Sequence, residues 1–152
     1  FTPLICTLSP TIKPPVPGHV YNLRTGAYLG AIKDRLAVET PLEALLAFAV
    51  TPYRIEAPAL RVVAERRPDG STRLLAEAES RPRAARRERH VVHFRLVAPD
   101  GTEWRDFAAS TTTDGGKTAH TFTLPLNAPA GTWRVMASEA LSGLGTEMTI
   151  EL

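Results

Sequence analysis

Two histidines three positions apart, His90 and His93, have the residue type and spacing that could hold a metal ion. On a helix this spacing would place both imidazoles on one face, whereas on a strand it places them on opposite faces. The segment HVVHFRLVA alternates apolar and polar residues, so we predict a strand over residues 90–98. No cysteine and no tight group of carboxylates lies nearby in the sequence to complete a tetrahedral zinc site. We therefore expect one histidine near the edge of the core, one on the surface, and no metal or other cofactor.

Hydroxyl side chains are concentrated between Ser110 and Thr118, where the sequence is STTTDGGKT. The chain contains no Gly-x-Ser-x-Gly motif and no cysteine–histidine signature of a nucleophilic enzyme. The run that begins at Asp114 ends like a phosphate-binding loop, but it lacks the first glycine of the Gly-x-x-x-x-Gly-Lys-Thr spacing. We predict that this run is the tip of a hairpin, where hydroxyl groups hydrogen-bond to their own backbone.

A glycoside hydrolase would need two carboxylates held at a set separation across a cleft. The available acids are Asp34, Glu39, Glu43, Asp100, Glu103 and Asp106. Nothing in their spacing distinguishes them from solvated residues at the ends of strands, so we predict that the chain is not an enzyme. A small hydrolase is the alternative from the enzyme class, and it predicts turnover by the isolated chain.

The densest charge lies in RPRAARRERH, residues 81–90, where five arginines accompany a single acid, Glu88. These arginines are Arg81, Arg83, Arg86, Arg87 and Arg89. They could contact phosphate, an acidic polysaccharide or an anionic partner surface, or they could belong to a solvated loop between two strands. No aromatic residue is interleaved with them for base stacking, and the net charge of the chain is only +2. The sequence therefore does not favour nucleic acid as a partner.

Exposed aromatic side chains are what a carbohydrate-binding face requires, because sugar rings stack on them. The candidates for ligand contact are Trp104, Tyr28 and Tyr53. Trp133 alternates with apolar residues and is assigned to the interior. Tyr21 and Tyr28 flank the turn in GHVYNLRTGAYLG, and we expect them to pack as a cross-strand pair. This opening segment is therefore predicted to be a hairpin rather than a pocket.

Short strands must position these residues, because thirteen prolines and ten glycines interrupt the chain with turns. Beyond Pro58, strands are predicted over residues 59–65, 71–79, 90–98, 120–126, 131–138 and 146–152. The last three strands alternate with strict period two, which predicts one buried and one solvated face. Their predicted inward residues are Phe122, Leu124 and Leu126, then Trp133, Val135 and Ala137, then Met148, Ile150 and Leu152. We predict an all-β protein whose larger part is an Ig-like antiparallel β-sandwich.

Prolines and changes of composition divide the chain into three parts. Residues 1–17 carry five prolines and are predicted to form a Pro-rich arm or linker. Residues 18–57 are predicted to form a small antiparallel β-subdomain, and residues 58–152 the sandwich. The run PLEALLAFAV, 41–50, could be a short helix or a buried strand. Because prolines bracket it closely, we favour the strand.

Cysteine content and hydropathy limit the cellular context. Cys6 is the only cysteine, so no internal disulfide stabilises the chain. No apolar run approaches the ~18 residues that a membrane span needs. The opening FTPLICTLSP lacks a basic leader and a long apolar centre, so no signal peptide is expected within this segment. Any export signal would lie upstream of it.

Two pieces of the chain together resemble a known class of modules. VYNLRTGAYLG, followed by AVETPLEALLAFAVTPYRIEAPALRV, resembles C-terminal β-modules of bacterial glycoside hydrolases, including beta-galactosidase-like proteins. HVVHFRLVAPDG and NAPAGTWRVMASEALSG resemble the Ig-like domains that follow such modules. The matching positions of the first piece are Tyr21, Arg24, Gly26, Tyr28, Leu29, Gly30, Pro52 and Tyr53, whereas Asn22 replaces an acid. The resemblance covers roughly residues 18–152 and implies no active-site residue.

This resemblance implies a non-catalytic accessory module of an exported bacterial carbohydrate-active protein. Such a module would space, dock or stabilise the catalytic domain of its parent, which is the first expected partner; a polysaccharide is the second. A periplasmic, extracellular or cell-surface location follows from the same comparison. Two alternatives stay open: a carbohydrate-binding module that uses Trp104 and neighbouring loops, and an adhesin or receptor-like Ig module.

Overall fold

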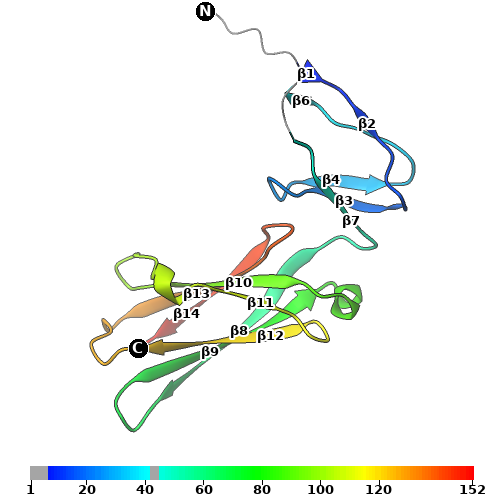
Figure 1. Ribbon diagram of the computed structural model, residues 1–152. Coiled ribbons are helices and arrows are strands. Elements are labelled where there is room, and N and C mark those ends of the chain that lie inside the picture. The colour runs from blue at the N-terminus through cyan, green and yellow to red at the C-terminus, as the bar shows by residue number, and fades with distance from the viewer. Residues whose placement is uncertain (1–6, 42–44) are drawn as a thin grey trace, which may run out of the picture. The chain divides into compact units, whose positions relative to one another are not determined.

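The computed structural model describes residues 7–41 and 45–152, and it confirms an all-β fold that contains a sandwich. The chain divides into two compact units, Phe1–Arg54 and Ile55–Leu152, which we describe separately. Figure 1 shows the strands of both units in chain order. The boundary lies close to the predicted one between residues 57 and 58, and residues 52–55 join the last strand of unit 1 to the first strand of unit 2.

Unit 1 consists of short antiparallel strands. These are β1 (Thr7–Leu8), β2 (Thr11–Ile12), β3 (Gly18–Asn22), β4 (Tyr28–Ile32), β5 (Leu36–Ala37), β6 (Thr40–Pro41) and β7 (Phe48–Thr51). Strand β3 is central between β4 and β7, whereas β1 pairs with β6 and β2 with β5. Of the strand predicted over residues 41–50, only the ends are found: Pro41 closes β6, and residues 48–50 lie in the half-buried β7. Residues 45–47 form no strand, and positions 42–44 lie outside the described residues.

The prediction of a Pro-rich arm is corrected for the described part of residues 1–17. Strands β1 and β2 continue along one register against β6 and β5, so residues 7–12 are an integral edge of unit 1. Pro10 interrupts this ladder because it has no N–H to donate. Its carbonyl still accepts a hydrogen bond of 3.1 Å from the N–H of Val38. The pairing thus tolerates a proline that favours extended backbone.

The predicted hairpin is present as β3 and β4. Asn22 organises its turn, because its side-chain Oδ1 accepts from the N–H of Arg24 at 2.9 Å and its carbonyl accepts from Gly26 at 2.8 Å. A carboxylate oxygen could accept the first of these bonds equally well. The tyrosines pair across the strands as predicted, since Tyr21 lies opposite Tyr28 with ring centroids 5.3 Å apart.

Two glycines of this hairpin have positive φ angles, but in different regions of backbone conformation. Gly26 has a φ of 70°, inside the left-handed region, whereas Gly30 has a φ of 122°, beside the β-bulge. A Cβ at Gly30 would meet no atom within 4 Å, so backbone strain alone would oppose a side chain there. We expect Gly30→Ala to destabilise unit 1 by about 2 kcal/mol and Gly26→Ala by about 1 kcal/mol.

Intrinsic fluorescence can separate the two units in this measurement. All three tyrosines lie in unit 1 and both tryptophans in unit 2, so denaturant unfolding followed by tyrosine emission reports on unit 1. Equal losses in the two variants, or a neutral Gly30→Ala, would contradict the assignment of strain to Gly30.

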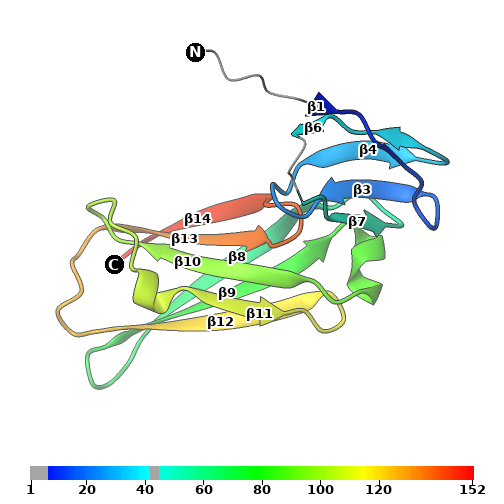
Figure 2. The same ribbon diagram turned by 45° about the horizontal axis from the view of Figure 1, so that its top comes forward.

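Unit 2 is a sandwich of two antiparallel sheets. Its elements are β8 (Glu56–Arg66), β9 (Thr72–Arg81), β10 (Val91–Val97), β11 (Ala109–Thr112), β12 (Lys117–Leu124), β13 (Thr132–Glu139) and β14 (Gly145–Glu151), with 3-10 helices η1 (Arg83–Arg87) and η2 (Arg105–Phe107). One sheet has the order β12-β9-β8 and the other β11-β10-β13-β14 (Figure 2). Strand β11 therefore pairs with β10 rather than with β12, unlike the fourth strand of an immunoglobulin constant domain.

The core of unit 2 follows the predicted alternation over most of its length. The buried cluster comprises Leu74, Ala76, Ala78, Val92, Phe94, Leu96, Ala98, Phe122, Leu124, Trp133, Val135 and Ala137. Two predicted inward residues are corrected. Leu126 is 73% exposed, because β12 ends at Leu124 and Pro125 begins a turn. Met148 is 36% exposed, because β14 is an edge strand.

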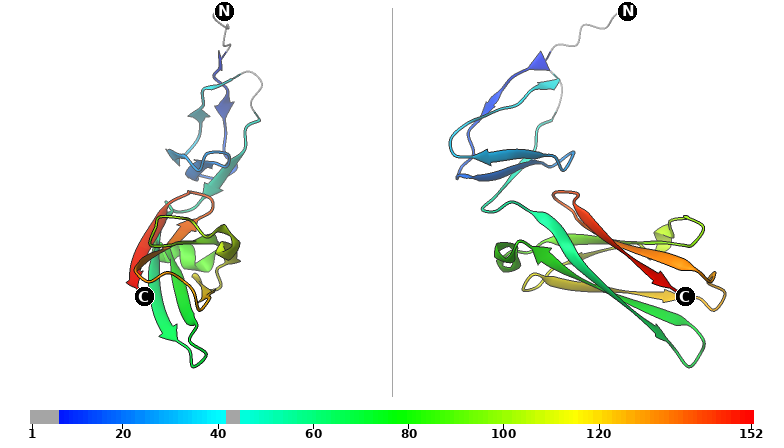
Figure 3. Two further views of the ribbon diagram at one scale, coloured as in Figure 1. Left: turned by 90° about the vertical axis from the view of Figure 1, so that its left-hand side faces the viewer. Right: turned by 180° about the vertical axis from the view of Figure 1, so that it is seen from behind.

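The β8–β9 hairpin extends beyond the body of the sandwich (Figures 1 and 3). Residues 63–69 are exposed, and the N–H of Gly70 donates to the carbonyl of Arg67 at 3.0 Å to close the turn. Asp69 accepts from both the hydroxyl and the N–H of Ser71, at 2.6 and 2.9 Å, and these bonds lower the pKa of Asp69 below its ordinary value. The predicted Pro-Asp-Gly turn at residues 68–70 is thereby confirmed.

Candidate functional site

The two histidines of the predicted strand lie on opposite sides of the sheet, as expected. His90 is buried beside the core, whereas the imidazole of the exposed His93 shares a hydrogen bond of 2.7 Å with the hydroxyl of Ser110 on β11. A histidine that is hydrogen-bonded to a serine can activate the serine as a nucleophile. Here it lies on the solvent face of the four-stranded sheet, and no described hydrogen bond joins His93 to a carboxylate that would orient it. Within the described residues, no group of three potential metal ligands comes together either.

His90 belongs to a buried polar network. Its Nδ1 lies 3.1 Å from Oε1 of Glu139, and both side chains are about 95% buried. The other carboxylate oxygen accepts from the hydroxyl and the N–H of Ser142, each at 2.7 Å. The N–H of His90 donates to the hydroxyl of Thr113 at 2.9 Å. Glu139 therefore lies between His90 and Ser142, an order that differs from a catalytic triad, in which the histidine contacts the serine.

Opposing effects set the ionisation of Glu139. Burial alone would raise the pKa of this carboxyl, but hydrogen bonds from His90, Ser142 and the N–H of Leu141 outweigh it and hold the pKa below its ordinary value. Glu139 is therefore an ionised carboxylate at neutral pH. Because an ionised carboxylate only accepts hydrogen bonds, Nδ1 of His90 carries the proton between them.

The network links connections between strands at one end of the sandwich. We call this end, made of residues 81–90, 113–116 and 140–144, the loop end (Figure 2). The N–H of Thr113 donates to the carbonyl of His90 at 2.8 Å, and the N–H of His90 donates to the Thr113 hydroxyl, which joins the first of these segments to the second. The His90–Glu139–Ser142 contacts join the first to the third. The loop end is thus a surface of fixed segments on a rigid scaffold, an arrangement that many Ig-like domains use for binding.

The arginines predicted to contact an anionic partner lie at the loop end. Arg81 ends β9, and helix η1 contains Arg83, Arg86 and Arg87, so the segment between β9 and β10 includes a short 3-10 helix. Arg81, Arg83 and Arg89 are exposed. These three exposed arginines come from one short segment of the chain, residues 81–89.

The predicted aromatic contact residues each make contacts within their own unit. The Trp104 ring packs edge-on against Trp133 at 4.7 Å and beside Phe107 at 5.3 Å, so most of it is committed to the core. Tyr53 is buried. Tyr28 is exposed, but the Arg54 guanidinium lies 4.8 Å above its ring.

Tyr28 is surrounded by side chains of unit 1. Besides Arg54, its ring lies 5.8 Å from the His19 ring, and its hydroxyl shares a hydrogen bond of 2.9 Å with Nδ1 of His19. Tyr21 packs on it from β3. These contacts help to hold the hairpin of β3 and β4 in shape, and Tyr28 is still 37% exposed.

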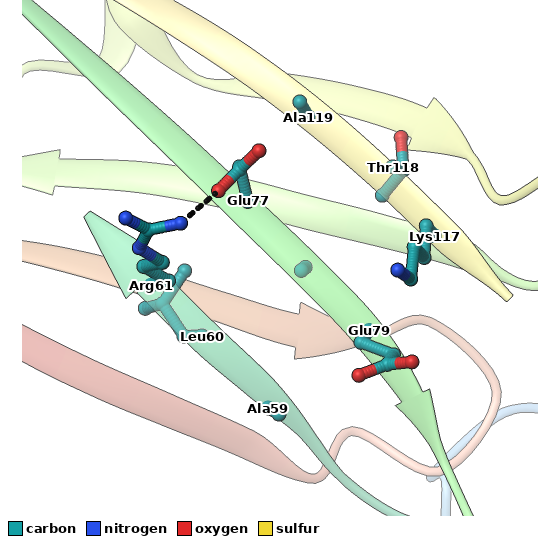
Figure 4. Close-up of a pocket in the computed structure, with 9 residues that line it drawn as sticks. Ala59, Leu60, Arg61, Glu77, Glu79, Lys117, Thr118 and Ala119 are labelled. Carbon is teal, nitrogen blue, oxygen red and sulfur yellow. Dashed lines mark ion pairs between the residues drawn. The ribbon is translucent and has the colours of Figure 1, made fainter. Parts of the chain in front are cut away.

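A shallow depression of about 570 Å³ lies on the outer face of the three-stranded sheet (Figure 4). Arg61 on β8 pairs with Glu77 on β9 at 3.5 Å, and Glu79 lies opposite Lys117 on β12. Small side chains, among them Ala59, Ala78 and Ala119, lie between the charged ones in this depression. The lining residues are Ala59, Leu60, Arg61, Glu77, Ala78, Glu79, Lys117, Thr118 and Ala119. Oppositely charged neighbours here are typical of a solvated sheet face.

Glu139 and Ser142 are the functional candidates that the sequence analysis missed. Glu139 continues the inward positions of Trp133, Val135 and Ala137 on β13, so the alternation contained the information that this acid is buried. His90 likewise continues the inward positions of β10. The sequence could not show that these two positions are neighbours, because register between strands is a tertiary property.

No protein family matches the chain, and no curated protein matches it either. Over residues 7–41 and 45–152, the helices are too short and too polar to cross a membrane. Sandwiches of this kind support many unrelated functions, so the fold by itself assigns none. A function has to be inferred from the arrangement of specific residues.

Proposed function

We propose that the chain is a non-catalytic accessory module of a larger, exported bacterial carbohydrate-active protein, where it spaces, docks or stabilises the catalytic domain. One observation carries this proposal. Both tryptophans are packed together in the sandwich, with Trp133 fully buried and Trp104 against it. Their rings therefore stabilise a rigid core. A module that holds other domains apart needs such a rigid body more than it needs a cleft.

The connection between the units supports the same role. Strand β7 ends at Thr51 and β8 begins at Glu56, so the two β-units follow each other after a short connector. Tyr53 and Ile55 within this connector are buried. The residues of the connector, 52–55, include no glycine or serine, the residues that make linkers most flexible. The resemblance of residues 18–152 to the β-modules of bacterial glycoside hydrolases agrees with this interpretation.

The reading frame upstream of the Phe1 codon tests the proposal directly. We expect it to continue into a catalytic domain that acts on carbohydrate. The parent protein should then be compared with a version truncated before β1. We expect the truncation to lower the thermal midpoint of the catalytic domain, or its turnover of polymeric substrate, while turnover of a small soluble substrate at low temperature is retained.

Two outcomes would contradict the accessory role. One is an upstream frame that contains no catalytic domain. The other is a truncated parent that matches the complete parent in thermal midpoint and in turnover of the polymer. Hydrolysis by the isolated chain would instead support the alternative of a small hydrolase.

A further inference from the structure

The loop end concentrates positive charge far beyond the average of the chain. Residues 81–89 contain five arginines and one glutamate, a net charge of +4, whereas the whole chain carries +2. The remainder of the chain is therefore net negative, at −2. A charge distribution of this kind creates a local field that attracts anions to one place on the molecule.

The exposed arginines of this segment differ from those on the strands. Arg61, Arg95 and Arg134 each lie within 4 Å of a glutamate, at 3.5, 3.9 and 3.9 Å. Arg83 and Arg89 form no ion pair with any of the described side chains, and the same holds for Arg81. Their charges are thus available to a partner from solution.

The backbone that carries these arginines is fixed. Ala85, at the centre of helix η1, is fully buried, and the helix lies against β9. The N–H of Ala85 donates to the carbonyl of Pro82 at 2.9 Å, and the N–H of Glu88 donates to the carbonyl of Ala85 at 3.2 Å. His90, which follows the last arginine, is held by Glu139. Fixed positions reduce the entropy that the segment would lose on binding.

We propose that residues 81–89 form a binding site for an acidic polysaccharide, one that bears carboxylate or sulfate groups. Guanidinium groups bind such oxyanions through paired hydrogen bonds. The segment has no aromatic side chain on which bases could stack, and no large apolar side chain that could enter a lipid interface. The choice of a polysaccharide among polyanions rests on the proposed function.

The test uses the complete 152-residue chain and two probes, polygalacturonate and heparin, with neutral galactan as the uncharged comparison. We expect retention by at least one acidic probe in affinity electrophoresis and no retention by galactan. Retention should weaken as sodium chloride is raised, because binding releases counterions. The double variant Arg83→Gln/Arg89→Gln should bind roughly tenfold more weakly, since each exposed charged contact contributes at most several-fold.

Arg66→Gln/Arg67→Gln is the matched control, because it removes two exposed arginines at the turn between β8 and β9. It should retain wild-type affinity, and both double variants should retain the wild-type unfolding midpoint by tryptophan fluorescence. The proposal is overturned if both double variants lose affinity equally, if Arg83→Gln/Arg89→Gln loses none, or if neither acidic probe binds. It is also overturned if duplex DNA or phosphatidylserine vesicles bind more tightly than both acidic probes.

Failure of the binding site and failure of the accessory role give different experimental outcomes. An upstream catalytic domain combined with no binding of either acidic probe would leave the accessory role in place and remove the site. Arginine-dependent binding combined with an upstream frame that lacks a catalytic domain would support the site and remove the accessory role.

Discussion

Trp133→Ala is expected to lower the free energy of unfolding of unit 2 by about 3–5 kcal/mol, the usual cost of truncating a fully buried tryptophan. The side chain is 0% exposed and lies at the centre of the buried cluster. Its indole N–H donates to the carbonyl of Pro129 at 3.0 Å, and its ring supports Trp104 edge-on. Domains of this size are stable by only about 5–15 kcal/mol, so the variant should retain little stability.

Denaturant unfolding followed by circular dichroism is the appropriate measurement, because the substitution removes one of only two tryptophans. Trp133→Phe is the matched comparison. It keeps most of the ring volume but loses the bond to Pro129, so its loss should be markedly smaller. Trp104→Ala should also destabilise unit 2, by less than Trp133→Ala, because Trp104 is only partly buried. A loss below about 1 kcal/mol for Trp133→Ala would contradict the central role assigned to this residue.

The sequence was sufficient to predict those strands and hairpins whose signals lie in neighbouring residues. Alternation of apolar residues places the side chains of one face of a strand together, so Phe122 and Trp133 were correctly predicted to lie inside. The hairpin of β3 and β4 was predictable for the same reason, since a short turn fixes the pairing of Tyr21 with Tyr28. In both cases the information lies within about ten neighbouring residues.

Predictions that depended on distant residues were less successful. Residues 7–12 were assigned to an arm because of their prolines, yet they pair with residues 36–41. The sequence of the arm could not show that a partner strand was available for its free backbone groups. Leu126 was assigned to the core because it continues an alternation, but Pro125 ends the strand before it. Alternation specifies a face only while the strand continues.

In the candidate site too, local features were predictable from the sequence and contacts between distant residues were not. The cluster of arginines in residues 81–89 is visible in the sequence itself and does not depend on how the chain folds. Their fixed presentation was not evident, because it depends on the burial of Ala85 and on contacts of His90 with Glu139 on another strand. Trp104 was a reasonable candidate for ligand contact from its place after a turn. Only the packing against Trp133 reveals that its ring is largely committed to the interior.

Unit 2 is expected to lose stability as the pH falls below 4.5, the ordinary pKa of a glutamate, and Glu139 should be a principal cause. The pKa of this carboxyl is depressed in the folded state, so the unfolded chain takes up its proton first. The stabilisation from ionised Glu139 is therefore complete above the unfolded pKa and is lost as the pH falls through the folded pKa. Denaturant midpoints measured by tryptophan fluorescence from pH 7 down to pH 3 would show this decline.

Two variants separate the charge of Glu139 from its packing. Glu139→Ala leaves the donors of Ser142 and His90 without their acceptor inside the protein, so we expect a loss of about 2–4 kcal/mol at pH 7. Glu139→Gln can still accept from Ser142 through its amide oxygen, and its amide N–H₂ can donate to Nδ1 of His90 once that histidine takes the other tautomer. Its loss at pH 7 should be only about 1 kcal/mol.

The decisive comparison is the difference between wild type and Glu139→Gln as a function of pH. Asp69 also has a lowered pKa, because Ser71 donates to it, and burial lowers the pKa of His120 below 6.5. Their protonation affects both proteins alike and cancels in the difference. The advantage of the wild type should therefore shrink as the pH falls below the ordinary pKa of glutamate. A difference that stays constant down to pH 3 would mean that Glu139 is not held as a carboxylate by the loop end, and that neutral hydrogen bonds suffice to join its segments.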